Sequence, residues 1–270
     1  RTPAPWIVDR PMPTDDIQTI DAVIAELDRI IALARTRGSR HGYFAALYRG
    51  TTIRVRDHIR QGKFRHPERL ARLDVCFARY YFEAERAWSS GQRPSDSWRA
   101  AFEAEPDDSV LILQHLLLGM NAHINLDLGQ ATAETAPGAL ADLDPDYRHL
   151  NRILKDMIDD VQDVLAPVSP WLRWVDRLGG PEDESLAGFS ITIARDQAWQ
   201  AAQTLDVMAD AHSKAAFVRE LDRKTRVLAR VVQIAGGWIA PLVRWRERDR
   251  KGRPEDVRAV IDAMVAAFPG

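Results

Sequence analysis

The sequence has very little cysteine and no excess of charge of either sign. Cys76 is the only cysteine among 270 residues, so no disulfide can form within the chain, and a reducing compartment such as the cytoplasm fits best. Lysine and arginine number 37 against 39 aspartate and glutamate residues, which gives a net charge of -2. Nucleic-acid-binding proteins ordinarily carry a clustered basic surface. We therefore do not expect nucleic acid as a partner.

The chain also lacks long apolar runs, internal repeats and the alternation that marks strands. Its longest uncharged stretch, residues 109–126, contains five strongly polar side chains, whereas a bilayer core needs ~20 mostly apolar residues. This excludes a membrane span there. Only FSITI at 189–193 hints at strand alternation, and it is too short to outweigh its surroundings. Apolar residues make up 46% and charged residues 28% of the chain, as in globular proteins.

Apolar residues instead recur at spacings of three and four, the pattern of amphipathic helices. We predict an all-α fold, a single bundle of about nine to eleven helices around a buried polar central helix. Thr14 should cap the first helix, and Asp107 with Asp108 the central one. The expected parts are an arm at 1–13, a core at 14–178 with the central helix at 108–128, and C-terminal helices at 179–270 packed on the same core. Other expected elements are helices at 14–37, 41–60, 67–88, 95–103, 145–165, 185–211 and 214–234, a loop or flap at 131–142, and two closing helices.

The central helix carries polar side chains where water is scarce. At 100° per residue, one strip of it collects His115, Gly119, His123 and Asp127, and a second strip collects Gln114, Asn121 and Asn125. Leucine and isoleucine fill the other directions, so both strips should be buried. A buried polar group without a partner costs roughly 1–3 kcal/mol, so these groups must bond one another, a ligand, a metal or water. The candidate catalytic residues are His115, Asn121, His123, Asn125 and Asp127.

Two chemistries suit these residues. His123 and Asp127 are one helical turn apart and could share a Zn²⁺, Fe²⁺ or Mn²⁺ ion, completed by His41 or His149 from a neighbouring helix. His115 lies ~12 Å from His123 along the axis, too far to share that metal. Without a metal, the histidines could act as general acid and base. The chain has no HExxH motif, no paired CxxC and no nucleotide-binding motif.

The segment DDVQD at 159–163 offers a different chemistry. Asp159, Asp160 and Asp163 have the spacing with which helical isoprenoid synthases hold Mg²⁺ and a diphosphate. The partner motif of Asn, Ser and Glu on a later helix is missing, and Arg152 and Lys155 lie on the same helix. We therefore expect a solvated acidic face.

Several sequence blocks resemble one known family. They are HGYFAALY at 41–48, RLDVCFARYYFEA at 72–84, SWRAAF at 97–102, LLLGMNAHINLDL at 116–128 and ARDQAW at 194–199. They resemble DUF5995, a family of uncharacterised, mostly actinobacterial helical proteins, over most of residues 40–200. The resemblance implies a single fold unit and an actinobacterial type of source, and it brings no catalytic assignment.

Three functions remain open on the sequence. The first is a small-molecule enzyme with a buried His/Asp/Asn pocket and metal-assisted hydrolase or lyase chemistry. The second is a terpene-like cyclase that uses DDVQD with Mg²⁺. The third is a non-catalytic binding or scaffold protein whose polar strips only lock the core. Arg195 carries a similar ambiguity, because it could clamp a carboxylate or phosphate, or pair with Asp74 to fix packing. The oligomeric state is not indicated.

Overall fold

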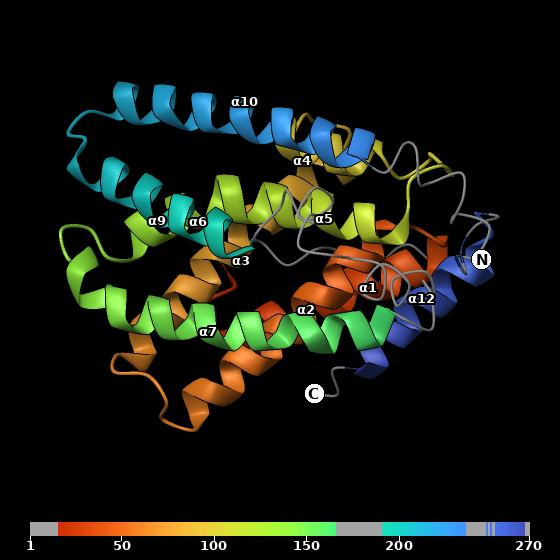
Figure 1. The fold of residues 1–270 in the computed structure, drawn as a ribbon, viewed down its shortest axis with the longest axis horizontal. Coiled ribbons are helices and arrows are strands. Elements are labelled where there is room, and N and C mark those ends of the chain that lie inside the picture. The colour runs from red at the N-terminus through yellow and green to blue at the C-terminus, as the bar shows by residue number, and fades with distance from the viewer. Residues whose placement is uncertain (1–15, 166–190, 236–246, 248, 250–251, 268–270) are drawn as a thin grey trace, which may run out of the picture.

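The structure contains helices and no strand among the residues it describes, which confirms the all-α prediction. It is a computed structural model that describes residues 16–165, 191–235, 247, 249 and 252–267, apart from the side chains of 155–165 and 235. Figure 1 shows the helices, which follow one another along the chain as α1 (Ile20–Arg37), α2 (His41–Arg60), α3 (Pro67–Ser89), α4 (Asp96–Glu103), α5 (Ile112–Ala122), the π-helical turn η2 (His123–Asp127), α6 (Leu128–Thr135), α7 (Leu140–Leu165), α9 (Ile191–Val207), α10 (Ala211–Ala235) and α12 (Pro254–Ala267).

The first helix begins later than predicted. Thr19, not Thr14, is the cap of α1, and its side chain accepts a hydrogen bond from the backbone N–H of Ala22 at 3.1 Å. Gly38 ends the helix in the left-handed conformation with a φ of 66°, which a residue without Cβ adopts easily. The apolar face lies in the core as its spacing predicts, with Ile20, Val23, Ile24, Leu27, Ile30, Ile31 and Ala34 all buried.

The central helix is continuous from α5 through η2 to α6, and both of its predicted ends are wrong. It begins at Ile112, whose backbone N–H donates to the buried carboxylate of Glu247 at 3.1 Å. Asp107 instead bonds Ser109 in the preceding turn. At the other end, Gly129 does not stop the helix. A Cβ at this position would lie 2.9 Å from the backbone oxygen of Ala198, so the glycine serves the close approach of α6 to α9.

The loop or flap predicted at 131–142 is mostly helical. Helix α6 runs to Thr135 and α7 begins at Leu140, so only a short connection remains between them. Pro145 lies inside α7, where its missing N–H removes one backbone hydrogen bond of the helix. Small residues were mistaken for turn formers because they also suit helices that approach closely. Ala131 and Thr132, for example, are fully buried.

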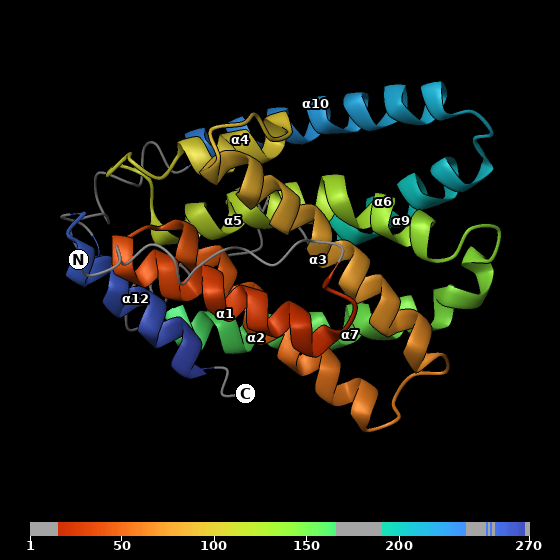
Figure 2. The same ribbon diagram turned by 180° about the vertical axis from the view of Figure 1, so that it is seen from behind.

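The helices pack around the central one. Figure 1 shows α10 along one side of α5 and α6, with α7 on the opposite side, and Figure 2 shows α1, α2 and α3 across the other face. Helix α10 contacts α4 and α5, α9 contacts α6 and η2, and α12 contacts α1 and α2. Residues 191–193, where strand alternation was considered, form the first turn of α9. None of the described helices is long and apolar enough to cross a membrane.

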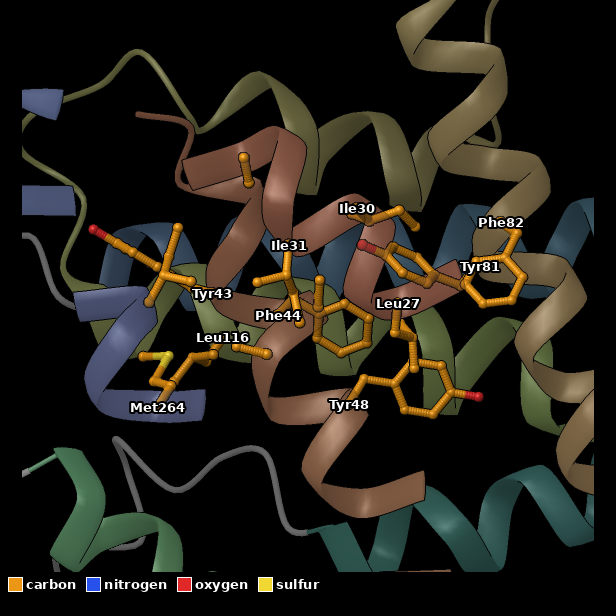
Figure 3. Close-up of a cluster of buried hydrophobic side chains, with 14 of the residues drawn as sticks. Leu27, Ile30, Ile31, Tyr43, Phe44, Tyr48, Tyr81, Phe82, Leu116 and Met264 are labelled. Atoms are coloured by element: carbon orange, nitrogen blue, oxygen red, sulfur yellow. The ribbon is translucent and has the colours of Figure 1, made fainter. Parts of the chain in front are cut away.

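The largest cluster of buried apolar side chains joins α1, α2, α3, α5 and α12. Figure 3 shows Leu27, Ile30 and Ile31 of α1 against the aromatic residues of α2 and α3. In that view the hydroxyls of Tyr43 and Tyr48 point away from the cluster in opposite directions. The two phenols therefore meet different surroundings, although both rings belong to one helix.

Candidate active site

A π-helical turn places the first candidate residues. Residues 123–127 form η2, in which the backbone N–H of Leu128 bonds the carbonyl of His123. Single π turns inside α-helices are rare and often mark functional sites. All five side chains of this turn are buried. The two titratable ones, His123 and Asp127, are 3% and 2% exposed.

His123 and Asp127 form a pair that Trp98 completes. The imidazole Nδ1 of His123 lies 3.2 Å from Oδ2 of Asp127. The same oxygen accepts a hydrogen bond from Nε1 of Trp98, on α4, at 2.9 Å. When Nδ1 carries the proton and donates it to Asp127, Nε2 keeps a lone pair. Asp127 thus fixes the orientation of the imidazole and leaves Nε2 free of the proton.

Aromatic rings enclose the imidazole. The ring of Phe77, on α3, stacks on His123 with 3.5 Å between centroids and 6° between planes. Tyr48, on α2, meets it edge-on at 4.5 Å, and Phe44 does so at 5.7 Å. These contacts hold the ring in one orientation and exclude water from its faces. Nε2 has no hydrogen-bond partner among the described residues.

Burial sets the protonation of the pair. It lowers the pKa of His123 well below the usual value for histidine, and the positive charge of Arg195 lowers this pKa further. Burial also raises the pKa of Asp127 well above the usual value for aspartate, although the hydrogen bond from Trp98 opposes this. Both effects favour the neutral forms. His123 is therefore a neutral imidazole at physiological pH.

Three further groups have a buried polar atom without a partner in the described part of the chain: the hydroxyl of Tyr48, whose ring contacts His123, Oδ2 of Asp74 and Nη2 of Arg195. Thr52 is near Tyr48, but its hydroxyl donates to the Tyr48 backbone carbonyl at 3.0 Å. Burial raises the pKa of Asp74 to about 7. The charge of Asp74 acts on Tyr48, and that of Arg195 acts on His123.

The amide strip of the central helix has a different role. Gln114 donates from Nε2 to the backbone carbonyl of Val232 at 2.8 Å, and Asn121 donates from Nδ2 to that of Thr225 at 2.9 Å. Asn125 in turn donates to Oδ1 of Asn121 at 3.0 Å. These bonds tie α10 to the central helix. The structure thus gives the predicted catalytic residues Asn121 and Asn125 structural contacts, away from the His123–Asp127 pair.

The other histidines do not join His123. His115 packs edge-on against Tyr43, with ring centroids 6.0 Å apart. His41 contacts the backbone oxygen of Phe102 at 3.2 Å through Nε2. His149, on α7, packs against Phe64 in the connection between α2 and α3, and burial lowers the pKa of His149.

The metal set proposed from the sequence, His123 and Asp127 with His41 or His149, is therefore not brought together. Among the described residues, no group of three or more His, Cys, Asp or Glu side chains could hold a metal ion.

Two sequence features lie partly or wholly outside the described structure. Asp159, Asp160 and Asp163 are on α7, in the part where side chains are not described. The boundary expected near residue 179 lies outside the described residues altogether.

Comparison with known proteins gives a family without a function. The profile of a family described as "Family of unknown function (DUF5995)" matches residues 20–234. The chain belongs to this family. No curated protein matches the chain, and no solved structure does.

Several groups around His123 were not predicted as site residues, although all lie within the DUF5995 match. Tyr48, Phe77 and Trp98 did not stand out in the sequence, because aromatic residues at helical spacing are typical of any apolar core. The signal that could have found them is periodic: Asp74, Phe77 and Tyr81 are three and four residues apart, so a carboxylate shares a helix face with two rings. The π-helical turn at residues 123–127 has no comparable pattern in the sequence.

Proposed function

We propose that this member of the DUF5995 family is a small-molecule enzyme in which His123 transfers a proton to or from the substrate. The observation that carries this proposal is the state of the imidazole: Nδ1 faces Asp127, while Nε2 is buried without a partner among the described residues. A buried, unpartnered nitrogen costs roughly 1–3 kcal/mol. A bound substrate that hydrogen-bonds Nε2 would remove this penalty.

A second group would supply the complementary proton. Burial raises the pKa of Asp74 to about 7, so near neutral pH this carboxyl populates both forms. A neutral imidazole can accept a proton while a protonated carboxyl donates one, and environments that separate two pKa values in this way are typical of acid–base pairs. Hydrolysis or an elimination of the lyase type fits such a pair. The substrate must be small, because helices enclose the residues concerned.

A divalent metal enters this proposal only through Nε2 of His123, whose lone pair is also a metal donor. Two or three further ligands would have to come from beyond the described residues, or from the substrate itself. Metal analysis of the purified protein separates the two forms of the proposal. A reducing location such as the cytoplasm is part of the proposal as well, and it rests on the single cysteine.

The test compares His123→Phe with the wild type on a panel of small esters, amides and hydroxy acids. Phenylalanine keeps a ring to stack on Phe77 and removes both nitrogens. We expect a loss of activity of about 10²–10⁴-fold, the usual contribution of general acid–base catalysis. The control is His58→Phe on α2, whose Nδ1 bonds the Arg54 carbonyl at 2.8 Å outside the site.

A direct measurement supports the activity comparison. Nitrogen-15 NMR should show His123 neutral at pH 7, with the proton on Nδ1. Full activity of His123→Phe would contradict the proposal. So would a charged imidazole at neutral pH, or a wild type that is inactive on the whole panel. The last two outcomes would favour the scaffold alternative.

A further inference from the structure

Arg195 is a buried cation without a counter-ion among the described residues. Its side chain, on α9, is 3% exposed. The Nε atom donates to Oδ1 of Asn151 on α7, and the guanidinium lies 5.1 Å from the centre of the Tyr147 ring. Nη2 is buried and has no partner there. An amide and a ring face do not neutralise a full charge, and an unpaired buried cation is strongly unfavourable.

The carboxylates among the described residues do not fill this role. The sequence allowed a pair between Arg195 and Asp74, but the two form no ion pair, and Oδ2 of Asp74 is itself without a partner among the described residues. Asp127 is occupied by Trp98 and His123. Arg195 lies on α9, which contacts the η2 turn that carries the unpartnered Nε2 of His123, yet neither Asp74 nor Asp127 compensates its charge.

We propose that Arg195 binds the carboxylate of a small organic acid, which places the substrate of the proposed enzyme beside Nε2 of His123. This inference rests on the proposed function and names its substrate class. Because Nε of Arg195 donates to Asn151, its two terminal nitrogens remain to donate a pair of hydrogen bonds to the two oxygens of one carboxylate. A phosphate carries more charge and usually needs several donors. Arg195 offers only its two terminal nitrogens, so the single charge and planar shape of a carboxylate fit better.

The position of Arg195 also suits the chemistry. Helix α9, which carries Arg195, packs against the η2 turn that carries His123, and the charge of Arg195 acts on that imidazole, so an anion held by Arg195 would have its neighbouring atoms near the base. The Tyr147 ring on one side and Asn151 on another fix the guanidinium before the ligand arrives. Such preorganisation lowers the entropy lost on binding.

The probes are sodium acetate, its neutral analogue acetamide, and inorganic phosphate, titrated calorimetrically into the full chain at constant ionic strength. We expect saturable binding of acetate, with acetamide and phosphate weaker by about tenfold or more, the usual gain of a charge-assisted hydrogen bond. This comparison needs no variant. Equal binding of acetamide, preferential binding of phosphate, or no binding of acetate would overturn the inference.

Variants then identify the residue. Arg195→Gln should weaken acetate binding at least about tenfold, and Arg195→Lys should restore part of it, because the charge returns without the fork. Arg148→Gln is the matched control, since this exposed arginine on α7 pairs with Asp144 and with no other carboxylate among the described residues. Circular dichroism checks that each variant is folded. Unchanged acetate affinity in folded Arg195→Gln would overturn the assignment.

The two proposals fail in different ways. If His123→Phe is fully active while acetate still binds through Arg195, the catalytic role of His123 is wrong and the carboxylate site stands. If His123→Phe is inactive and acetate does not bind, the carboxylate site is wrong and the catalytic role stands.

Discussion

Replacing Tyr48 by phenylalanine should raise the stability of the protein, whereas the same replacement at Tyr43 should lower it. Both tyrosines are on α2 and are buried, at 5% and 0% exposure. The hydroxyl of Tyr43 donates to Oδ2 of Asp249 at 2.8 Å, where Nε of Arg40 also bonds. The hydroxyl of Tyr48 has no partner among the described residues. The change is chemically identical, so only the surroundings differ.

The magnitudes follow from these contacts. Loss of a hydrogen bond to a charged group costs about 1.5–3 kcal/mol, so Tyr43→Phe should lower Tm by about 3–12 °C. Removing an unpartnered buried hydroxyl relieves about 1 kcal/mol, so Tyr48→Phe should raise Tm by about 2–4 °C.

Thermal and urea unfolding, followed by circular dichroism, measure both effects. If Tyr48→Phe destabilises the protein as much as Tyr43→Phe does, the Tyr48 hydroxyl has a partner and is not held free for a ligand.

Three other changes test the remaining structure. Asn121→Ala should lower the free energy of unfolding by about 2–4 kcal/mol, because it breaks the bond to α10 and leaves the Asn125 amide unpaired. Urea unfolding measures this change, and a decrease of less than about 0.5 kcal/mol would contradict the prediction. Gly119→Ala should destabilise by about 1–3 kcal/mol although alanine favours helices, since its Cβ would lie 2.6 Å from the Phe44 ring; a raised Tm would show that the ring can move. Asp74 has a pKa of about 7 in the folded chain, so it binds a proton more tightly there than in the unfolded chain, and its contribution makes the free energy of unfolding fall as pH rises from about 4 to about 7. Asp74→Asn should flatten this part of the curve of unfolding free energy against pH. An unaltered slope of that curve would refute the raised pKa.

The sequence predicted the helices better than the site because helix signals are local. Apolar spacing and Pro67 at the first helical position placed α2 and α3 to within a residue. The predicted ends of the central helix failed because both depend on distant contacts: Glu247 at its start and the close packing of α9 against Gly129.

The site shows the same division between local and distant information. The contact of His123 with Asp127 could be predicted, because four residues separate them on one helix. The contributions of Trp98 and Tyr48 could not, since they come from other helices. Nor could the sequence show which polar strip was structural. An amide that bonds a backbone carbonyl of α10 leaves no mark on the sequence of α10.

That last feature bears on which mutations the protein can tolerate. Gln114 and Asn121 hold α10 through its main-chain carbonyls at Val232 and Thr225, and a carbonyl is the same for every amino acid. These two bonds therefore fix where α10 lies without restricting which side chains it carries. Residues along α10 can be exchanged freely as far as this anchoring is concerned, provided the helix itself persists. Replacement of Gln114 or Asn121 on the central helix, in contrast, cannot be compensated by a change of side chain on α10.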